Sequence, residues 1–276
     1  MKRLILAVLI SSTLAACGGG GSSAVTTPTN NTQKLSFYGS PLGSTPAAQT
    51  ASFSFISEAV ADTPMDDTVL SLQQALAANG VTATVTPQVM TATDLHALIM
   101  GTDGGLPPTN DEFKTDFNSW VVANFQPDDM VTPMAQQISA LAQFQQDVTT
   151  FIERMHVAGK QVWMVSPVPT CDYPAGVSMN GMYTAADGAV LALQAAAASA
   201  GGQNTGAVPH TYETITNPDG TTYLEDTYLV AHMGADCRTP DTTILNARTT
   251  QIAADVAKGL SELASSTTAA SAPAAQ

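Results

Sequence analysis

Three residues of the sequence carry the side chains that nucleophilic acyl transfer uses: Ser40, His232 and Asp236. Ser40 lies in Gly39-Ser40-Pro41, directly after a short apolar run, and many hydrolases hold their nucleophile at the end of a strand. His232 lies four residues before Asp236, and an aspartate can orient an imidazole that takes the proton of a serine. The commoner interpretation is a serine in a turn and a histidine packed beside a loop.

Other polar residues offer weaker chemistry. Pro41 biases Ser40 towards an extended conformation, which favours the turn interpretation. Asp128 and Asp129 form an acidic pair that is typical of a solvated loop or a helix start. The four histidines are dispersed, and no cysteine–histidine spacing indicates zinc. We therefore predict no metal site and no cofactor.

Short apolar runs alternate with longer helical patterns along the chain. A helix that starts at Asp66-Asp67 ends at Gly80, and another ends at Gly159. Asn217-Pro218-Asp219-Gly220 predicts the turn of a hairpin between Tyr212 and Leu224. The predicted strands are 35–38, 81–85, 120–125 and 161–166, and the main predicted helices are 66–80, 133–157, 186–198 and 244–263.

This alternation predicts an α/β fold with three layers, α/β/α, around a central and mainly parallel sheet. Ligands of such sheets bind beyond the carboxyl ends of the strands. The loops after Gly39, Phe125 and Pro167 should therefore meet at one edge, together with the loop around Cys237 that leads into the last helix.

Four segments have a recognisable order. Gly39-Ser40-Pro41 ends the first strand, and 91-TATDL-95 follows Val89. The strand 121-VVANF-125 runs into 126-QPDD-129, and 236-DCRTPD-241 precedes the last helix. In order and context, residues 34–264 resemble the SGNH (GDSL-type) hydrolases, which are mostly esterases, lipases and carbohydrate deacetylases.

The resemblance implies a serine nucleophile, an oxyanion hole and a histidine three residues after an aspartate. Most of these chemical positions are replaced here. Pro41 stands at the serine, Val89 at the oxyanion glycine, Asp128 at the asparagine and Thr239 at the histidine, whereas Asp236 keeps its identity.

Two functional hypotheses follow. The first is a catalytically impaired SGNH-like domain with a binding or structural role, whose ligand would be a glycan, an acyl group or a protein. The alternative is an active ester hydrolase that uses Ser40 with a displaced base such as His232.

The N-terminal segment predicts the compartment. Lys2 and Arg3 precede an apolar run too short to span a bilayer, and small residues lead to Cys17. This segment resembles a bacterial lipobox, with 1–16 as signal peptide and 17–33 as lipidated cysteine and flexible linker. An ordinary secretory signal is the alternative. Gly18 is not the aspartate that favours inner-membrane retention, so we expect a lipid-anchored protein of the cell envelope, in the outer membrane.

Charge and cysteine content agree with this location. The net charge is −14, and cleavage removes Lys2 and Arg3, which leaves 7 basic and 23 acidic residues and a net charge of −16. Such a charge disfavours nucleic acid as a partner. Cys171 and Cys237 form an even pair in an oxidising compartment, so we expect a disulfide between them. The Ala/Ser/Thr-rich residues 265–276 are expected to form a disordered tail.

Overall fold

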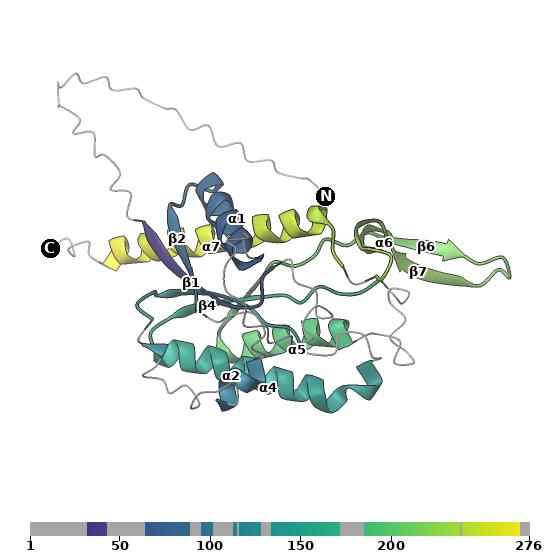
Figure 1. Ribbon diagram of the computed structural model, residues 1–276, viewed down its shortest axis with the longest axis horizontal. Helices are drawn as coiled ribbons and strands as arrows, with labels where there is room; N and C mark the ends of the chain where they lie inside the picture. Colours follow the sequence, from purple (N-terminus) through teal and green to yellow (C-terminus); the bar gives the residue numbers. More distant parts are fainter. Residues whose placement is uncertain are drawn as a thin grey trace, which may run out of the picture. The chain divides into compact units, whose positions relative to one another are not determined.

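The centre of the domain is a sheet of five short parallel strands. They are β1 (Gln33–Gly39), β2 (Ala83–Pro87), β3 (Trp120–Asn124), β4 (Gln161–Val165) and β5 (Gln203–Thr205), in the order β2-β1-β3-β4-β5 (Figure 1). This order is that of a flavodoxin-like doubly wound sheet. The structure, a computed structural model, describes residues 32–42, 64–88, 95–101, 113–114, 116–127, 134–171, 185–237 and 239–270. All five strands belong to one unit, Asn31–Gln276.

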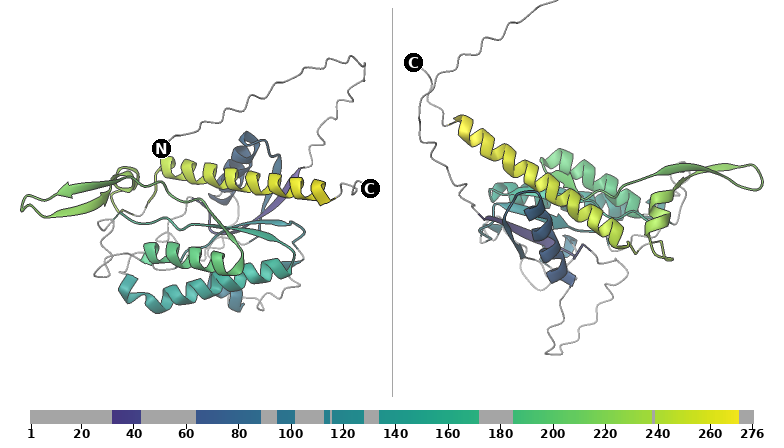
Figure 2. Two further views of the ribbon diagram at one scale, coloured as in Figure 1. Left: turned by 180° about the vertical axis from the view of Figure 1, so that it is seen from behind. Right: turned by 90° about the horizontal axis from the view of Figure 1, so that it is seen from above.

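Helices cover both faces of this sheet, as the near-continuous apolar strands require. α1 (Pro64–Ala78) and α7 (Thr242–Ala270) lie on one face, and α2 (Leu95–Met100), α4 (Ile138–Val157) and α5 (Ala185–Ala200) lie on the other (Figure 2). The predicted three-layer α/β/α fold is therefore confirmed.

The strands supply side chains to two separate cores because neighbouring residues of a strand point to opposite faces. Leu35 and Phe37 of β1 pack with α1 and α7, whereas Tyr38 packs with α4. Phe151 of α4 makes edge-to-face contacts with Tyr38, Phe113 and Phe125 at centroid distances of 5.4–6.0 Å. These contacts fix the helix layer against the carboxyl half of β1 and β3.

A two-stranded hairpin and a short helix precede α7. β6 (Tyr212–Thr216) and β7 (Thr222–Asp226) pair antiparallel around the predicted turn, and in both views of Figure 2 they extend away from the parallel sheet. α6 (Thr227–His232), which the apolar pattern did not predict, starts directly at the end of β7. The carboxylate of Asp226 accepts a hydrogen bond from the Leu229 amide and so caps this helix.

The carboxyl-terminal end differs from the expectation. α7 continues to Ala270, six residues into the segment that was expected to be a disordered tail. None of the helices among the described residues has both the length and the apolar composition needed to cross a bilayer.

Candidate functional site

The turn after β1 is held in place by the end of β3. Gly39 has a φ of 92°, and a Cβ at this position would overlap the carbonyl group of Asn124. The Ser40 amide donates to the Asn124 carbonyl oxygen at 3.0 Å. In return, Nδ2 of Asn124 donates to the carbonyl oxygens of Ser40 at 2.8 Å and of Pro41 at 3.3 Å. The turn is therefore fixed by one backbone hydrogen bond and by two hydrogen bonds from the buried Asn124 side chain.

Among the described residues, this turn offers no pair of donors for an oxyanion. Pro41, which the family resemblance aligns with the serine, has neither a hydroxyl nor a backbone N–H. The donors of Asn124 are used on the turn, and its Oδ1 is buried without a partner among the described residues. An oxyanion needs preorganised donors, whereas this strand end presents an acceptor.

Hydrogen bonds stabilise the loop that contains Asp236 and Thr239. Asp236 accepts hydrogen bonds from the Thr239 amide at 3.0 Å and from its hydroxyl at 2.6 Å. Thr239 is the residue that the family resemblance aligns with the histidine. The predicted disulfide between Cys171 and Cys237 is confirmed, and the Cys171 amide donates to the Cys237 carbonyl at 3.1 Å. Together these bonds fix the loop that leads into α7.

The hydrogen-bond partner of His232 is Asp241 and not Ser40 or Asp236. Its Nδ1 lies 2.9 Å from Oδ2 of Asp241, and its ring packs on Tyr228 at a centroid distance of 4.6 Å. Asp241 also caps α7 by accepting from the amides of Thr243 and Ile244. The hydrogen bond with His232 is the main cause that lowers the pKa of this carboxyl. No hydrogen bond joins His232 to Ser40 or to Asp236, all three of which the structure describes.

Arg248 is hydrogen-bonded to three of the loops at this edge of the sheet. Its guanidinium is fully buried and donates to the carbonyl oxygens of Leu42 (3.4 Å), Ser166 (2.6 Å) and Gly206 (3.1 Å). These residues follow β1, β4 and β5. Burial lowers the pKa of Arg248 to about 10, so the group is still charged at neutral pH.

A pocket of about 380 Å³ lies beyond the carboxyl ends of β4 and β5, beside α5. It lies on the edge where parallel sheets bind their ligands. Apolar and polar side chains share its wall, and the lining residues are Ser166, Pro167, Pro169, Asp187, Val190, Leu191, Gln194, Ala207, Val208, His210 and Tyr212.

His210 is held at the rim of this pocket by a buried carboxylate. Its Nδ1 lies 2.5 Å from Oδ2 of Asp226, which also accepts from the Thr211 amide at 3.1 Å. The rings of His210 and Tyr212 are nearly parallel, with an interplanar angle of 7° and a centroid distance of 5.6 Å. The pocket therefore has an oriented imidazole and an aromatic face.

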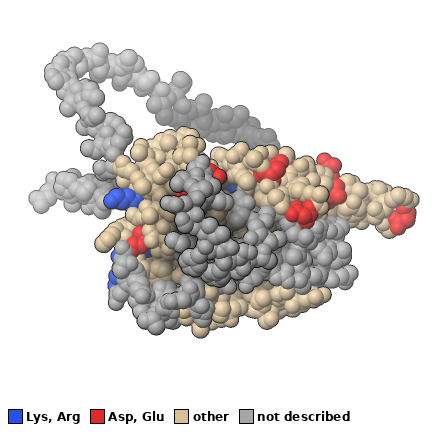
Figure 3. Space-filling view, in the orientation of Figure 1, with Lys and Arg blue, Asp and Glu red and all other residues tan. Residues whose placement is uncertain are grey.

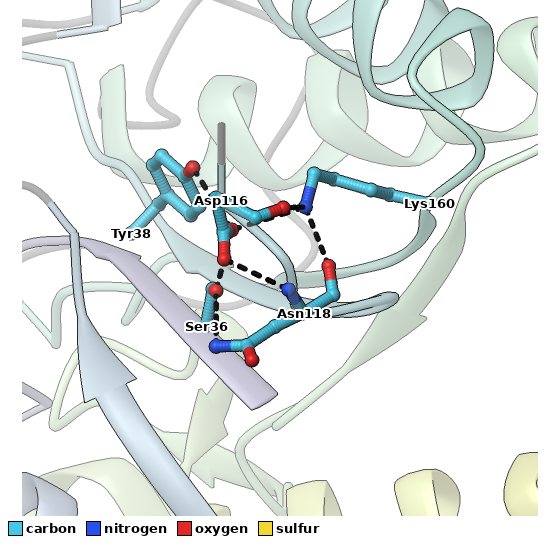
Figure 4. A network of polar contacts seen from close by, with 5 residues as sticks. All are labelled: Ser36, Tyr38, Asp116, Asn118 and Lys160. Carbon is cyan, nitrogen blue, oxygen red and sulfur yellow. Dashed lines mark hydrogen bonds and ion pairs between the residues drawn. The ribbon is translucent and has the colours of Figure 1, made fainter. Parts of the chain in front are cut away.

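A second polar cluster lies at the opposite edge of the sheet (Figure 4). Lys160 is buried 3.1 Å from the Asp116 carboxylate, which also accepts from the hydroxyls of Ser36 and Tyr38. Burial, together with the charge of Asp116, raises the pKa of the Tyr38 hydroxyl. The cluster precedes β3 and β4, at the amino ends of the strands, so we assign it to stability.

Several predicted positions lie outside the described residues: Cys17, Val89, Asp128 and Asp129. Within the described ranges, no three His, Cys, Asp or Glu side chains form a group that could hold a metal ion. The sequence interpretation did not single out Arg248 or Tyr212, and it took His210 for a rim or core residue. A useful signal for the last two was their place at the start of the predicted hairpin, next to the carboxyl edge of the sheet.

Comparisons with known proteins give similarity in structure only. No protein family and no curated protein matches the sequence. A protein assigned as an SGNH hydrolase from Slackia heliotrinireducens matches with 16% identity over 81% of this chain and 98% of that chain, at a TM-score of 0.46. LAE5, an alpha/beta hydrolase enzyme from the metagenome of Lake Arreo, matches with 13% identity over 82% and 95%, at 0.48. Axe2, an acetylxylan esterase from Geobacillus stearothermophilus, matches with 13% identity over 79% and 91%, at 0.44.

Proposed function

We propose that this protein is a lipid-anchored component of the bacterial cell envelope whose SGNH-like domain binds a ligand and does not hydrolyse esters at the family's serine position. The proposal is based on the hydrogen bonds of Pro41 and Thr239, the residues at the replaced serine and histidine positions. Pro41 has its carbonyl bound by Asn124, and Thr239 bonds Asp236 through its amide and hydroxyl. Both residues stabilise loops, and neither can transfer a proton near neutral pH.

The anchor is proposed from the sequence. A basic start, a short apolar run and small residues before Cys17 support cleavage ahead of this cysteine and its lipidation. Several acyl chains give stable attachment, and Gly18 supports the outer membrane. The membrane is then the first partner. The second is a ligand of the domain, which could be a glycan, an acyl group or a protein, whereas the strong negative charge disfavours nucleic acid.

The binding role is supported by the pocket at the carboxyl edge of β4 and β5, which is distinct from the replaced catalytic positions. A cavity of this size is within the range of small-molecule sites. Arg248 and the disulfide hold the surrounding loops, so the pocket is preformed.

An activity test on the full chain, purified in detergent, separates binding from hydrolysis. The substrates are nitrophenyl acetate and butyrate, and the probe is a serine-directed fluorophosphonate. We expect hydrolysis at the rate of the buffer blank and no labelling. Labelling that disappears in Ser40→Ala, with hydrolysis that disappears in both Ser40→Ala and His232→Gln, would establish the alternative, an active serine ester hydrolase.

A further inference from the structure

The hydrogen-bonding groups of the β4–β5 pocket decide what kind of ligand it can hold. Asp187, in the first turn of α5, presents a carboxylate, which only accepts hydrogen bonds. Pro167 and Pro169 have no backbone N–H to offer. Gln194 and Ser166 can both donate and accept. The described wall therefore carries one carboxylate and several groups that can both donate and accept, and it includes no lysine or arginine.

His210 adds an imidazole at the rim of the pocket. Its Nδ1 lies 2.5 Å from Oδ2 of Asp226, and this carboxylate also accepts from the amides of Thr211 and Leu229. The ring is therefore held in place, and the His210 side chain is 37% exposed.

The formal charges around the pocket also favour a cationic ligand. No lysine or arginine occurs between Gln161 and Cys237, the stretch that forms the pocket and the β6–β7 hairpin. In Figure 3 acidic side chains gather over the end of the molecule that carries α6 and this hairpin. Arg248 lies beneath the pocket, but it is fully buried and its N–H groups bond the carbonyls of Leu42, Ser166 and Gly206. A ligand therefore meets Asp187 and cannot meet this guanidinium.

The remaining wall is apolar and partly aromatic. Val190, Leu191 and Val208 line it together with the two prolines, and Leu191 is 58% exposed. The Tyr212 ring is 53% exposed and lies parallel to the His210 ring. An aromatic face next to a carboxylate attracts a cation, and the aliphatic wall accepts a hydrocarbon body.

We propose that the β4–β5 pocket binds an organic ammonium compound: an amino group directed at Asp187, on an apolar body that packs against Tyr212 and the aliphatic wall. This inference rests on the proposed binding function and specifies its ligand class. It also disfavours carboxylates and phosphates, because no lysine or arginine is among the described residues that line the pocket.

Three probes with one body and different head groups test the charge preference. They are para-fluorophenylethylamine, para-fluorophenylethanol and para-fluorophenylpropionate. Each is titrated by fluorine NMR against the full chain in nanodiscs of zwitterionic lipid, with empty nanodiscs as the blank. We expect the amine to bind about tenfold more tightly than the alcohol, and the carboxylate to bind more weakly than both.

Two pocket variants and one control variant test whether the amine binds in this pocket. Asp187→Asn should weaken amine binding about tenfold and leave alcohol binding unchanged. Glu153→Gln removes one carboxylate from an exposed position of α4 and should change neither. Tyr212→Leu keeps the apolar contact, removes the aromatic face and should weaken the amine more than the alcohol. It serves as the second test if Asp187→Asn fails to fold.

The outcomes are distinct. Equal affinity for amine and alcohol, tighter binding of the carboxylate, or no amine binding up to about 10 mM would each overturn the proposal. An amine preference that survives in both Asp187→Asn and Tyr212→Leu would overturn the assignment to this pocket. Failure of the wider binding function is seen separately, as phosphonate labelling of Ser40.

Discussion

At the scale of single residues, Asn124 and Thr239 make hydrogen bonds that stabilise loops near the positions that the family resemblance assigns to catalysis. Thr239 stands where a histidine is expected and bonds Asp236 through both its amide and its hydroxyl. Asn124 uses its amide donors on the carbonyls of Ser40 and Pro41. That Pro41 and Thr239 stand at the serine and histidine positions of the family is a prediction from residue identity alone. The sequence could not predict these bonds, because side-chain partners across loops depend on the tertiary structure.

Among the buried residues near the carboxyl ends of the strands, Arg248 should be the one whose substitution lowers the free energy of unfolding most. Arg248→Met keeps the length of the side chain but leaves the buried carbonyls of Ser166 and Gly206 without their donor. We expect the free energy of unfolding to fall by about 2–4 kcal/mol, measured by urea denaturation. Part of the loss is offset because the variant no longer buries a charge.

The control is Arg154→Met, because Arg154 lies on α4 and reaches the Ile99 carbonyl from a partly exposed position. Its cost should stay within about 1 kcal/mol. Equal losses in the two arginine variants would show that Arg248 does not hold the loops of the edge.

Asp241 provides a test of pH dependence. The His232 hydrogen bond is the main cause that lowers its pKa, with the amides of Ile244 and Thr243 adding to it. A carboxyl whose pKa is lower in the folded state than in the unfolded state stabilises the fold above its usual pKa. That stabilisation is lost as the pH falls through the folded value. In His232→Leu the pKa of Asp241 should rise towards its usual value, as followed by carboxyl NMR.

Asp219 is the internal reference for that titration. Its pKa is lowered chiefly by the Thr221 hydroxyl in the hairpin turn, which His232 does not contact. The Asp219 value should be the same in both proteins. If Asp241 keeps its low pKa in His232→Leu, the helix amides are its main cause and His232 is not a structural partner.

At the scale of elements, the sequence predicted the strands and long helices well. Alternating apolar runs and helical periodicity are local signals, and they place the bounds of β1, β3 and β4 within two residues of those observed and the bounds of α4 and α7 within seven. α6 was missed because its six residues are too few for a periodic pattern. The pocket was missed as well, since it depends on the contact of α5 with the segment after β5, which no local pattern encodes.

The disulfide is the strongest link between elements at the carboxyl edge. It joins Cys171, after β4, to Cys237, before α7, and spans 66 positions. In Cys171→Ser/Cys237→Ser the free energy of unfolding should fall by about 4 kcal/mol, because the unfolded chain regains the entropy of a large loop. The measurement is guanidinium denaturation of both proteins with and without a reductant.

The reductant should lower the stability of the wild-type protein to that of the double variant and should not affect the variant. A wild-type protein that is insensitive to reductant under unfolding conditions would contradict the presence of the bond in the purified protein.

At the scale of the whole molecule, charge is distributed unevenly along the chain. The stretch from Gln161 to Cys237 has no lysine or arginine, although it includes β4, α5, the pocket and the hairpin. Seven basic residues remain after the proposed cleavage, and all lie outside this stretch. The carboxyl edge of the sheet is therefore the acidic end of the domain, which agrees with a ligand that carries positive charge.

Attachment to the membrane should depend on one cysteine. The wild-type chain is expected in the membrane fraction and to incorporate labelled fatty acid, because several acyl chains together bind a bilayer stably. Cys17→Ala removes the acceptor of the lipid, so labelling should be lost and the cleavage that depends on lipidation should fail. Cys171→Ala is the matched control, since it removes a cysteine of the disulfide and leaves the anchor intact. Fatty-acid labelling that persists in Cys17→Ala, or is lost in Cys171→Ala, would show that the protein is not anchored through Cys17.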